Sequence, residues 1–322
     1  MDSLVSTGKR SFFDNIKHFV KIKYVIRIAM YAMLLDLAFV FIYPFLYMII
    51  TAIKSPQDVA DTTVNWLVNE IHWSNFTLSW AMLKYPTRLL RTIVVVGLCT
   101  FGHVISCSFI GYGFARFEFP GKGTFFGFLL LSIIVPTQTI IIPLYMLYAN
   151  LGFTGTELPL ILPTFFGFGF SGGLFIFIFR QFYLSLPKSL EEAASIDGCG
   201  PFKTFFKIAF PSSRSSIMVC MVLSLVWHWN DYFEPTIYIT KEENYLLPMA
   251  LPGLYKMIQN SSSSLSDIPG MSSAEAVNLS MIYTEAVAMA ATVLVVLPVF
   301  ILYMFLQKQF IQGVERSGIT GE

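Results

Sequence analysis

Six apolar runs, each long enough to cross a lipid bilayer, constrain the fold of this chain more than any other feature of its sequence. They cover about residues 28–50, 92–115, 124–148, 158–179, 216–238 and 284–306. A membrane-spanning helix needs about 20 mostly apolar residues, whereas the helices of globular proteins average about 12. Charged residues make up only 13% of the chain and gather between the runs. We therefore predict an all-α integral membrane protein with six transmembrane helices.

Lys and Arg are distributed unequally between the two sides of such a protein. Fifteen of the 21 fall before the first run, between runs two and three, between runs four and five, or after the sixth. Because the side richer in Lys and Arg faces the cytoplasm, both termini are predicted to be cytoplasmic. The chain then divides into a basic N-terminal segment (1–27), a membrane domain (28–306) and a C-terminal tail (307–322). A net charge of +1 argues against nucleic acid as a partner.

The cysteines and histidines show no spacing that is typical of a metal site or a disulfide framework. No C-x-x-C pair occurs, and the four histidines are scattered. We predict free thiols that pack as small apolar side chains, and no metal site. The four cysteines are Cys99, Cys107, Cys199 and Cys220.

The loop between runs four and five, residues 186–211, contains residues that typically start and end helices, and they predict two short helices. Ser189 and Glu192 form a capping-box pattern, which predicts a helix from Leu190. Gly198 can adopt the left-handed conformation that ends a helix. Pro201 suits the first turn of a second helix, and we expect Pro211 to end it. The second helix would place an aromatic face, formed by Phe202, Phe205, Phe206 and Ala209, at the membrane boundary.

This loop resembles the EAA loop of ABC importer permeases. In that family the loop forms a coupling helix that docks in a cleft of the cytoplasmic ATPase. The resemblance therefore implies a coupling role for Glu192, Ala193, Ala194, Asp197, Gly198, Ile208 and Pro211. Phe210 stands where the family more often has Leu, which is a conservative apolar change.

Further segments are similar to the carbohydrate-uptake branch of the family, and to the smaller, six-span permease of the maltose-type transporter. They are residues 112–116, 119–121, 136–138, 142–145, 229–231 and 309–314. The chain departs from the family at residues 171–173, where Pro is frequent, and at Arg91, where Asn is more usual. The resemblance implies carbohydrate import, with oligosaccharide as the expected cargo, across a bacterial cytoplasmic membrane, inner or sole.

The sequence predicts that ATP is hydrolysed by another subunit. A phosphate-binding loop needs G-x-x-x-x-G-K followed by Ser or Thr, and the nearest match, Gly121-Lys122-Gly123-Thr124, lacks the leading glycine. We therefore expect this chain to bind no cofactor, with ATP and Mg²⁺ used by the partner ATPase. The resemblance implies a second homologous permease, two ATPase subunits and an extracytoplasmic sugar-binding protein.

Candidate residues for the substrate pathway lie late in the fifth run and in the third. Trp229 offers a flat apolar face with a polar edge, which suits a sugar ring. Asn230 and Asp231 are costly at membrane depth unless they face protein or water. Gln138 follows the helix-breaking Pro136 and is a further candidate. The alternative for Trp229 and Asn230 is a structural role as interfacial anchor or packing residue.

Two other functions remain as alternatives. The chain could be an ABC importer permease for a non-sugar solute such as an amino acid, osmolyte or phosphate. It could also be an intramembrane serine protease, with Ser171 of a Gly-x-Ser-Gly pattern as nucleophile and His228 as its base. Close packing of small residues between membrane helices explains the Gly-rich stretch more simply.

Overall fold

The computed structural model describes residues 3–61, 66–169, 171–264 and 284–319. Within these ranges the regular structure is helical throughout, which confirms the all-α class. The longer helices are α1 (Ser3–Ala52), α4 (Tyr85–Arg116), α5 (Lys122–Ile134), α6 (Thr137–Asn150), α8 (Gly172–Ser185), α12 (Arg214–Asn230), α14 (Ala250–Ser264) and α16 (Glu285–Ile319). The shorter ones are α2 (Pro56–Ala60), α3 (Ser74–Met82), α7 (Leu158–Ile161), η1 (Leu162–Phe166), α9 (Ser189–Ile196), α10 (Pro201–Thr204), η2 (Phe205–Ala209), α11 (Phe210–Ser212), α13 (Phe233–Tyr238) and η3 (Glu242–Asn244).

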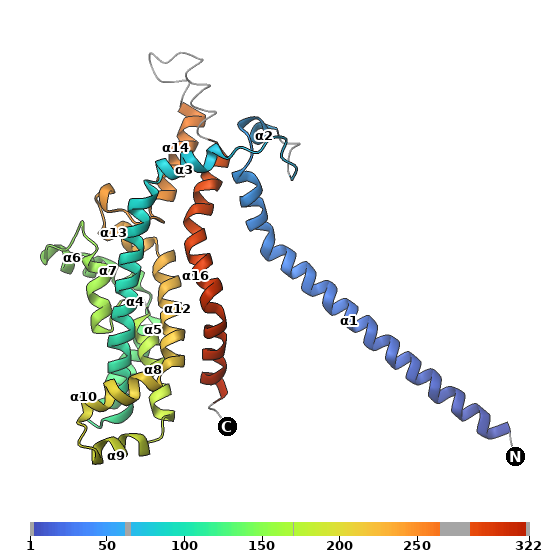
Figure 1. The fold of residues 1–322 in the computed structure, drawn as a ribbon, viewed down its shortest axis with the longest axis horizontal. Coiled ribbons are helices and arrows are strands. Elements are labelled where there is room, and N and C mark those ends of the chain that lie inside the picture. The colour runs from blue at the N-terminus through green and yellow to red at the C-terminus, as the bar shows by residue number, and fades with distance from the viewer. Residues whose placement is uncertain (1–2, 62–65, 170, 265–283, 320–322) are drawn as a thin grey trace.

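Helices α4, α8, α12 and α16 form the centre of the molecule (Figure 1). Helix α4 packs against both α8 and α12, and α12 also packs against α16. Helices α4 and α8 approach closely at Gly111, where an added Cβ would lie 2.8 Å from the Cβ of Phe179. Small residues at helix contacts are typical of membrane proteins, because they let two backbones approach closely. Close approach of helix backbones at such small residues therefore helps to hold the core together.

The third and fourth apolar runs do not form single helices. Run three is divided into α5 and α6, which meet at 104°, because Pro136 removes an amide donor and favours extended backbone at Val135. The prediction that residues 158–179 form one spanning helix is wrong. This segment is broken into α7, η1 and the start of α8, with Gly167 and Gly169 both in the left-handed region.

Among the described residues, length and composition identify three helices that can each cross a membrane, at Tyr24–Ala52, Tyr85–Arg116 and Glu285–Gly313. Two bent pairs, α5 with α6 and α10–α11 with α12, raise the number to five if each pair is one span. Helix α8 is apolar but shorter. Helices α1 and α16 each continue from an apolar run into a terminal segment, α1 from Ser3 and α16 as far as Ile319.

Helix α1 extends away from the rest of the molecule (Figure 1). It contacts α16 near its C-terminal end, where the hydroxyl of Tyr47 donates to the carboxylate of Glu285 at 3.2 Å. The described side chains from Tyr24 to Phe45 are all exposed, although they are largely apolar. A long apolar helix without neighbours needs lipid or another membrane helix around it.

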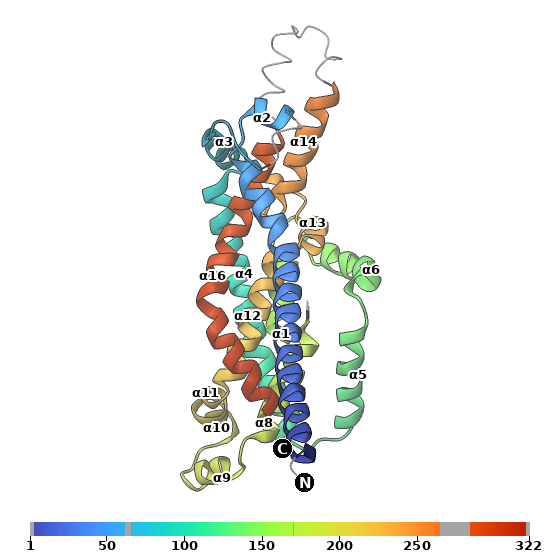
Figure 2. The same cartoon turned by 90° about the vertical axis from the view of Figure 1, so that its right-hand side faces the viewer.

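The two ends of the molecule differ in what they carry. The beginning of α1 and the end of α16 lie at the same end as α9 and α10, and α2, α3 and α14 lie at the other (Figures 1 and 2). At the α2 end, the Asn69 side chain donates to Asp58 at 2.7 Å, and this hydrogen bond lowers the pKa of the Asp58 carboxyl. Arg91, one of the departures from the family pattern, is paired with Glu157 at 2.7 Å.

Candidate functional site

The first helix of the 186–211 loop begins without a side-chain cap. Leu190 N–H donates to Pro187 O at 3.3 Å, and Glu192 N–H donates to Lys188 O at 3.0 Å. Ser189 is therefore already inside α9, and Lys188 occupies the capping position with helical backbone angles. The predicted capping box between Ser189 and Glu192 is wrong for this reason, since a residue within the first turn is not placed to accept from the amide three residues on.

Gly198 ends α9 in the left-handed conformation, as predicted, with φ of +74°. The Cys199 N–H donates back to Ala194 O at 2.9 Å, and the Gly198 N–H donates to Ser195 O at 3.1 Å. A Cβ added at position 198 would meet nothing within 4 Å. Glycine is thus required here by the backbone conformation and not by lack of space.

An ion pair fastens the start of α9 to the end of α4. Arg116 Nε donates to the Glu191 carboxylate at 2.7 Å, and its Nη2 donates to Leu186 O at 2.6 Å. The two side chains are only 7% and 19% exposed, so water screens the pair weakly. The sequence analysis singled out Arg116 only as part of a motif and did not find Glu191. The cue was present, because Arg116 lies between the second and third runs and Glu191 between the fourth and fifth, so both are predicted on the same side of the membrane.

The second helix is built from α10, the π-helical turn η2 and α11. Pro201 occupies its first turn, as predicted, but the chain turns at Ser213, two residues beyond Pro211. Phe205 and Ala209 are buried, with Phe205 edge-on to Tyr183 at 6.4 Å. Phe202 and Phe206 are 68% and 55% exposed. The predicted aromatic face is therefore divided, with Phe205 and Ala209 in the core and Phe202 and Phe206 at the surface.

Most residues assigned to coupling lie on the outside of this structure. Glu192, Ala193, Asp197, Gly198 and Pro211 are exposed. Ala194 is buried, and Ile208 is half-buried. Ile196, which the sequence analysis did not select, is 87% exposed. An exposed Ile beside small side chains on a rigidly held helix forms a surface that another protein can contact closely.

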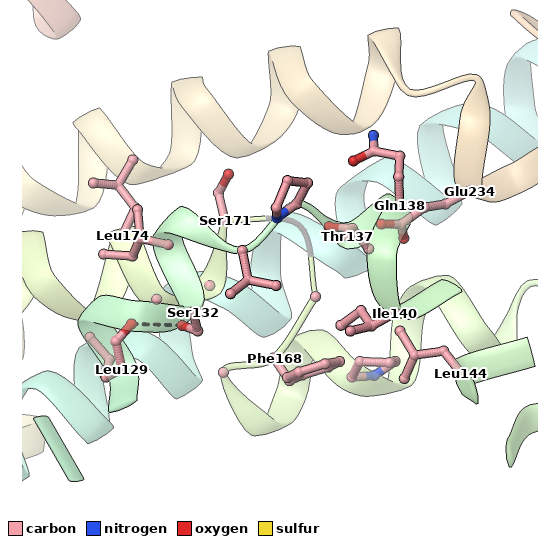
Figure 3. Close-up of a pocket in the computed structure, with 18 of the residues that line it drawn as sticks. Leu129, Ser132, Thr137, Gln138, Ile140, Leu144, Phe168, Ser171, Leu174 and Glu234 are labelled. Atoms are coloured by element: carbon pink, nitrogen blue, oxygen red, sulfur yellow. Dashed lines mark hydrogen bonds between the residues drawn. The ribbon is translucent and has the colours of Figure 1, made fainter. Parts of the chain in front are cut away.

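A second candidate site is a cavity of about 680 Å³ between α5 and α6 on one side and α8, α12 and α13 on the other. The broken segments form much of its wall, because Val135, Pro136, Gly167 and Gly169 line it. Figure 3 shows Thr137 and Gln138 at one end of the cavity and Ser171 and Leu174 towards the other. Most of the remaining wall is apolar and includes Leu129, Ile140, Leu144 and Phe168.

Of the four residues predicted for the substrate pathway, only Gln138 lines this cavity. Trp229 is buried between α12 and α16, and its Nε1 donates to Val295 O at 3.2 Å. The side chain of Asn230 is exposed and donates to Val226 O at 2.9 Å. The Asp231 carboxylate accepts from the N–H groups of Phe233 and Glu234, at 3.0 and 3.3 Å, and so supports the turn into α13. A pathway role for these three stays a prediction.

Sequence analysis missed Glu234, which also lines the cavity. Its Oε1 atom is buried and accepts no hydrogen bond from the described residues. Figure 3 shows the carboxylate directed from α13 towards the segment that carries Thr137. The signal was available, since a carboxylate inside the apolar run 216–238 is a functional-site candidate in its own right.

A histidine pair lies behind the cavity wall. His228 lines the cavity, and its Nε2 is 3.3 Å from Nδ1 of the fully buried His103. The two rings stack with centroids 5.2 Å apart. Ser171 and His228 share the cavity, but among the described residues no hydrogen bond joins them. The contact that a serine protease needs between nucleophile and base is therefore not formed.

A bundle of long apolar helices with an exposed helical loop at one end defines a multi-pass membrane protein. Comparison with known proteins places it more closely. The family described as "Binding-protein-dependent transport system inner membrane component" matches residues 108–316. The chain belongs to this family and is an ABC importer permease subunit.

Relatives and a solved structure agree with this assignment. The arabinooligosaccharide transport system permease AraQ of Halalkalibacterium halodurans is 26% identical over 294 residues, covering 88% of this chain and 93% of the relative. The melibiose/raffinose/stachyose import permease MelC of Bacillus subtilis is 26% identical over 280 residues, covering 86% and 91%. A chain of a bacterial ABC transporter that imports the acidic polysaccharide alginate has the same fold, with a TM-score of 0.73 at 21% identity, covering 89% of this chain and 96% of that chain.

Proposed function

We propose that this chain forms half of the translocation pathway of a carbohydrate importer and couples the pathway to ATP hydrolysis on a separate subunit. The observation that carries the proposal is similarity over most of the chain to permeases named for arabinooligosaccharides and for melibiose, raffinose and stachyose. Oligosaccharide is accordingly the expected cargo. A non-sugar solute is the alternative, and family membership by itself is compatible with it.

The coupling role of residues 186–211 is supported by how the loop is built. The Gly198 turn and the Arg116–Glu191 pair fix the position of α9, while Ile196 and most residues of the EAA pattern are exposed. A surface that is rigidly held and open to another protein transmits a displacement instead of absorbing it. ATP and Mg²⁺ would be bound by the ATPase partner and not by this chain.

The remaining partners follow from the same proposal. A second homologous permease would cover the exposed face of α1 and the open side of the cavity, and two ATPase subunits would dock at the α9 end. An extracytoplasmic sugar-binding protein would deliver the cargo at the α2 and α14 end. The chain would lie in a bacterial cytoplasmic membrane with both termini in the cytoplasm, as the excess of Lys and Arg at that end indicates.

Loss and restoration of sugar uptake in cells tests the function. Cells in which the gene for this chain is deleted are expected to lose uptake of one class of oligosaccharide from a panel of arabino- and galacto-oligosaccharides, and to regain it when the gene is restored. Uptake of amino acids and phosphate serves as the control. Loss confined to one of those solutes, with sugar uptake intact, would establish the alternative cargo.

Cysteine accessibility tests the orientation. A cysteine introduced by Gln57→Cys on the exposed surface of α2 is expected to react with a membrane-impermeant thiol reagent in intact cells. The native Cys199 is expected to react with the same reagent only in inverted membranes. The reverse pattern would place α9 outside the cell and exclude its coupling role.

A further inference from the structure

The cavity between α5, α6 and α13 combines an apolar wall with a few polar groups at its ends. Its volume, about 680 Å³, falls within the roughly 300–1,000 Å³ typical of small-molecule sites. The polar side chains include Thr137, Gln138, Ser171 and Glu234. Phe168 contributes an aromatic side chain to the wall. A sugar has this same combination of apolar C–H faces and a rim of hydroxyl groups.

Glu234 is the feature of the cavity that structure alone leaves unexplained. Its buried Oε1 accepts no hydrogen bond within the described chain, and an unsatisfied buried carboxylate oxygen is costly. The neighbouring Asp231 does not relieve the cost, because an ionised carboxylate has no hydrogen to donate, and its Oδ1 itself accepts from two backbone N–H groups. A ligand that donates O–H groups would satisfy Glu234, since an ionised carboxylate only accepts hydrogen bonds.

The charge of the cavity lining also limits the ligand. Among the described residues that line the cavity, none is Lys or Arg, so Glu234 and the imidazole of His228 are the titratable groups that matter most. A carboxylate without a cationic partner repels an anionic ligand in surroundings of low polarity. The transporter with a similar fold that carries an acidic polysaccharide shows that the fold leaves cargo charge open. The lining of the pathway must therefore set it.

We propose that this cavity is a subsite for uncharged, hydroxyl-rich sugars, in which Glu234 accepts hydrogen bonds from sugar hydroxyls and disfavours carboxylated or phosphorylated ligands. The inference rests on the proposed carbohydrate function and deepens it by fixing the charge of the cargo. Thr137, Gln138 and Ser171 supply further hydrogen-bonding groups around the sugar.

The labelling rate of a thiol placed in the cavity reports both the charge of the cavity and its occupancy by a sugar. The full chain, in membranes with its partner subunits, would carry Ser171→Cys and Cys199→Ser; the other native cysteines are buried. The thiol is labelled with a cationic and an anionic methanethiosulfonate reagent, and each rate is divided by that of a free thiol. Labelling at pH 8, above the ordinary pKa of imidazole of about 6.5, keeps His228 neutral.

We expect the cationic reagent to react on the order of tenfold faster than the anionic one after this correction. Glu234→Gln should abolish the preference, Glu234→Asp should retain it, and Glu243→Gln, the same change at an exposed residue outside the cavity, should leave it unaltered. A thiol that reacts with neither reagent, or a preference that survives Glu234→Gln, would overturn the proposal.

The ligand is tested with raffinose and its galacturonosyl counterpart, in which a carboxylate replaces the primary alcohol of the galactose unit. Raffinose should slow labelling of Ser171→Cys severalfold, the acidic counterpart should not, and Glu234→Gln should reduce the difference. Equal protection by both sugars would refute the charge selectivity. If the Glu234→Gln complex imports sugar normally and its labelling is unchanged, this inference alone is refuted. If the wild-type complex imports no sugar, the proposed function is refuted.

Discussion

The α9 end of the molecule and the central cavity are built in different ways. The α9 end is local and tightly bound, with a helix of eight residues ended by a left-handed glycine and held to α4 by one shielded ion pair. The cavity is assembled from segments that are far apart in sequence, such as those carrying Gln138 and Glu234, and lies where helices are broken. The difference teaches that the part proposed to meet another protein is preformed, while the part proposed to meet the cargo is left open.

The largest expected effect separates backbone conformation from space at the α9 end. Gly198→Val should reduce transport more than tenfold with normal amounts of protein in the membrane, because a β-branched residue in the left-handed region is strained by more than the usual 1–2 kcal/mol. Uptake and membrane abundance are measured together.

Gly200→Val is the matched control for that substitution. Gly200 also has open space around it, but its φ is −72°, so we expect transport within about twofold of wild type. If the two variants behave alike, the left-handed turn is not what positions α9, and the α9 end is less preformed than described here.

A smaller effect is expected from loosening α9 without changing its backbone. Glu191→Gln should cost about 1.5–3 kcal/mol of stability, because it removes the charge that pairs with the shielded Arg116. The thermal midpoint of the purified complex and the number of sugar molecules moved per ATP are both expected to fall.

The exposed pair between Lys122 and Glu118 provides the comparison, since Glu118 is 87% exposed. Glu118→Gln should cost less than about 0.5 kcal/mol and leave the ratio of sugar to ATP unchanged. A loss of stability in Glu191→Gln with a normal ratio would make the Arg116–Glu191 pair merely structural.

The assignment of residues to the cavity is tested by two substitutions, one expected to affect assembly of the complex and the other its affinity for sugar. Trp229→Phe should cost about 1–2 kcal/mol, since the hydrogen bond to Val295 and some packing are lost, and should lower the amount of assembled complex without changing the ranking of competing sugars. Gln138→Ala should change the apparent affinity for sugar with little loss of complex. The reverse pattern would restore Trp229 to the pathway and remove Gln138 from it.

Much of the fold could be predicted from the sequence because its causes are local. Apolar runs of sufficient length gave the helical membrane class, and Gly198 and Pro201 predicted the turn and restart in the 186–211 loop. The breaks between α5 and α6 and before α8 could not be placed, because proline and glycine permit a break but neighbouring helices decide whether it forms. The run 158–179 was therefore mistaken for one helix.

The candidate sites were predictable to different degrees, because some depend on a contiguous sequence pattern and others on contacts between distant segments. The EAA pattern is contiguous, so its residues were found together, although the capping box failed by one residue of register. The partners of Arg116 and the surroundings of Trp229 depend on contacts more than 60 residues apart in the chain. Glu234 could not be assigned to the cavity from sequence, because its place in the lining depends on α5 and α6, which lie far from it in the chain.

ATP-driven uptake by proteoliposomes tests the central claim most directly. The complex of this chain with its partner permease and ATPase subunits would be reconstituted with the sugar-binding protein, and uptake of radiolabelled raffinose or arabinooligosaccharide measured with ATP supplied at the α9 side. We predict uptake against a concentration gradient that stops when the ATPase subunits are omitted and when Gly198→Val is introduced. Concentrative uptake that persists without the ATPase, or ATP hydrolysis that never moves sugar, would contradict the account.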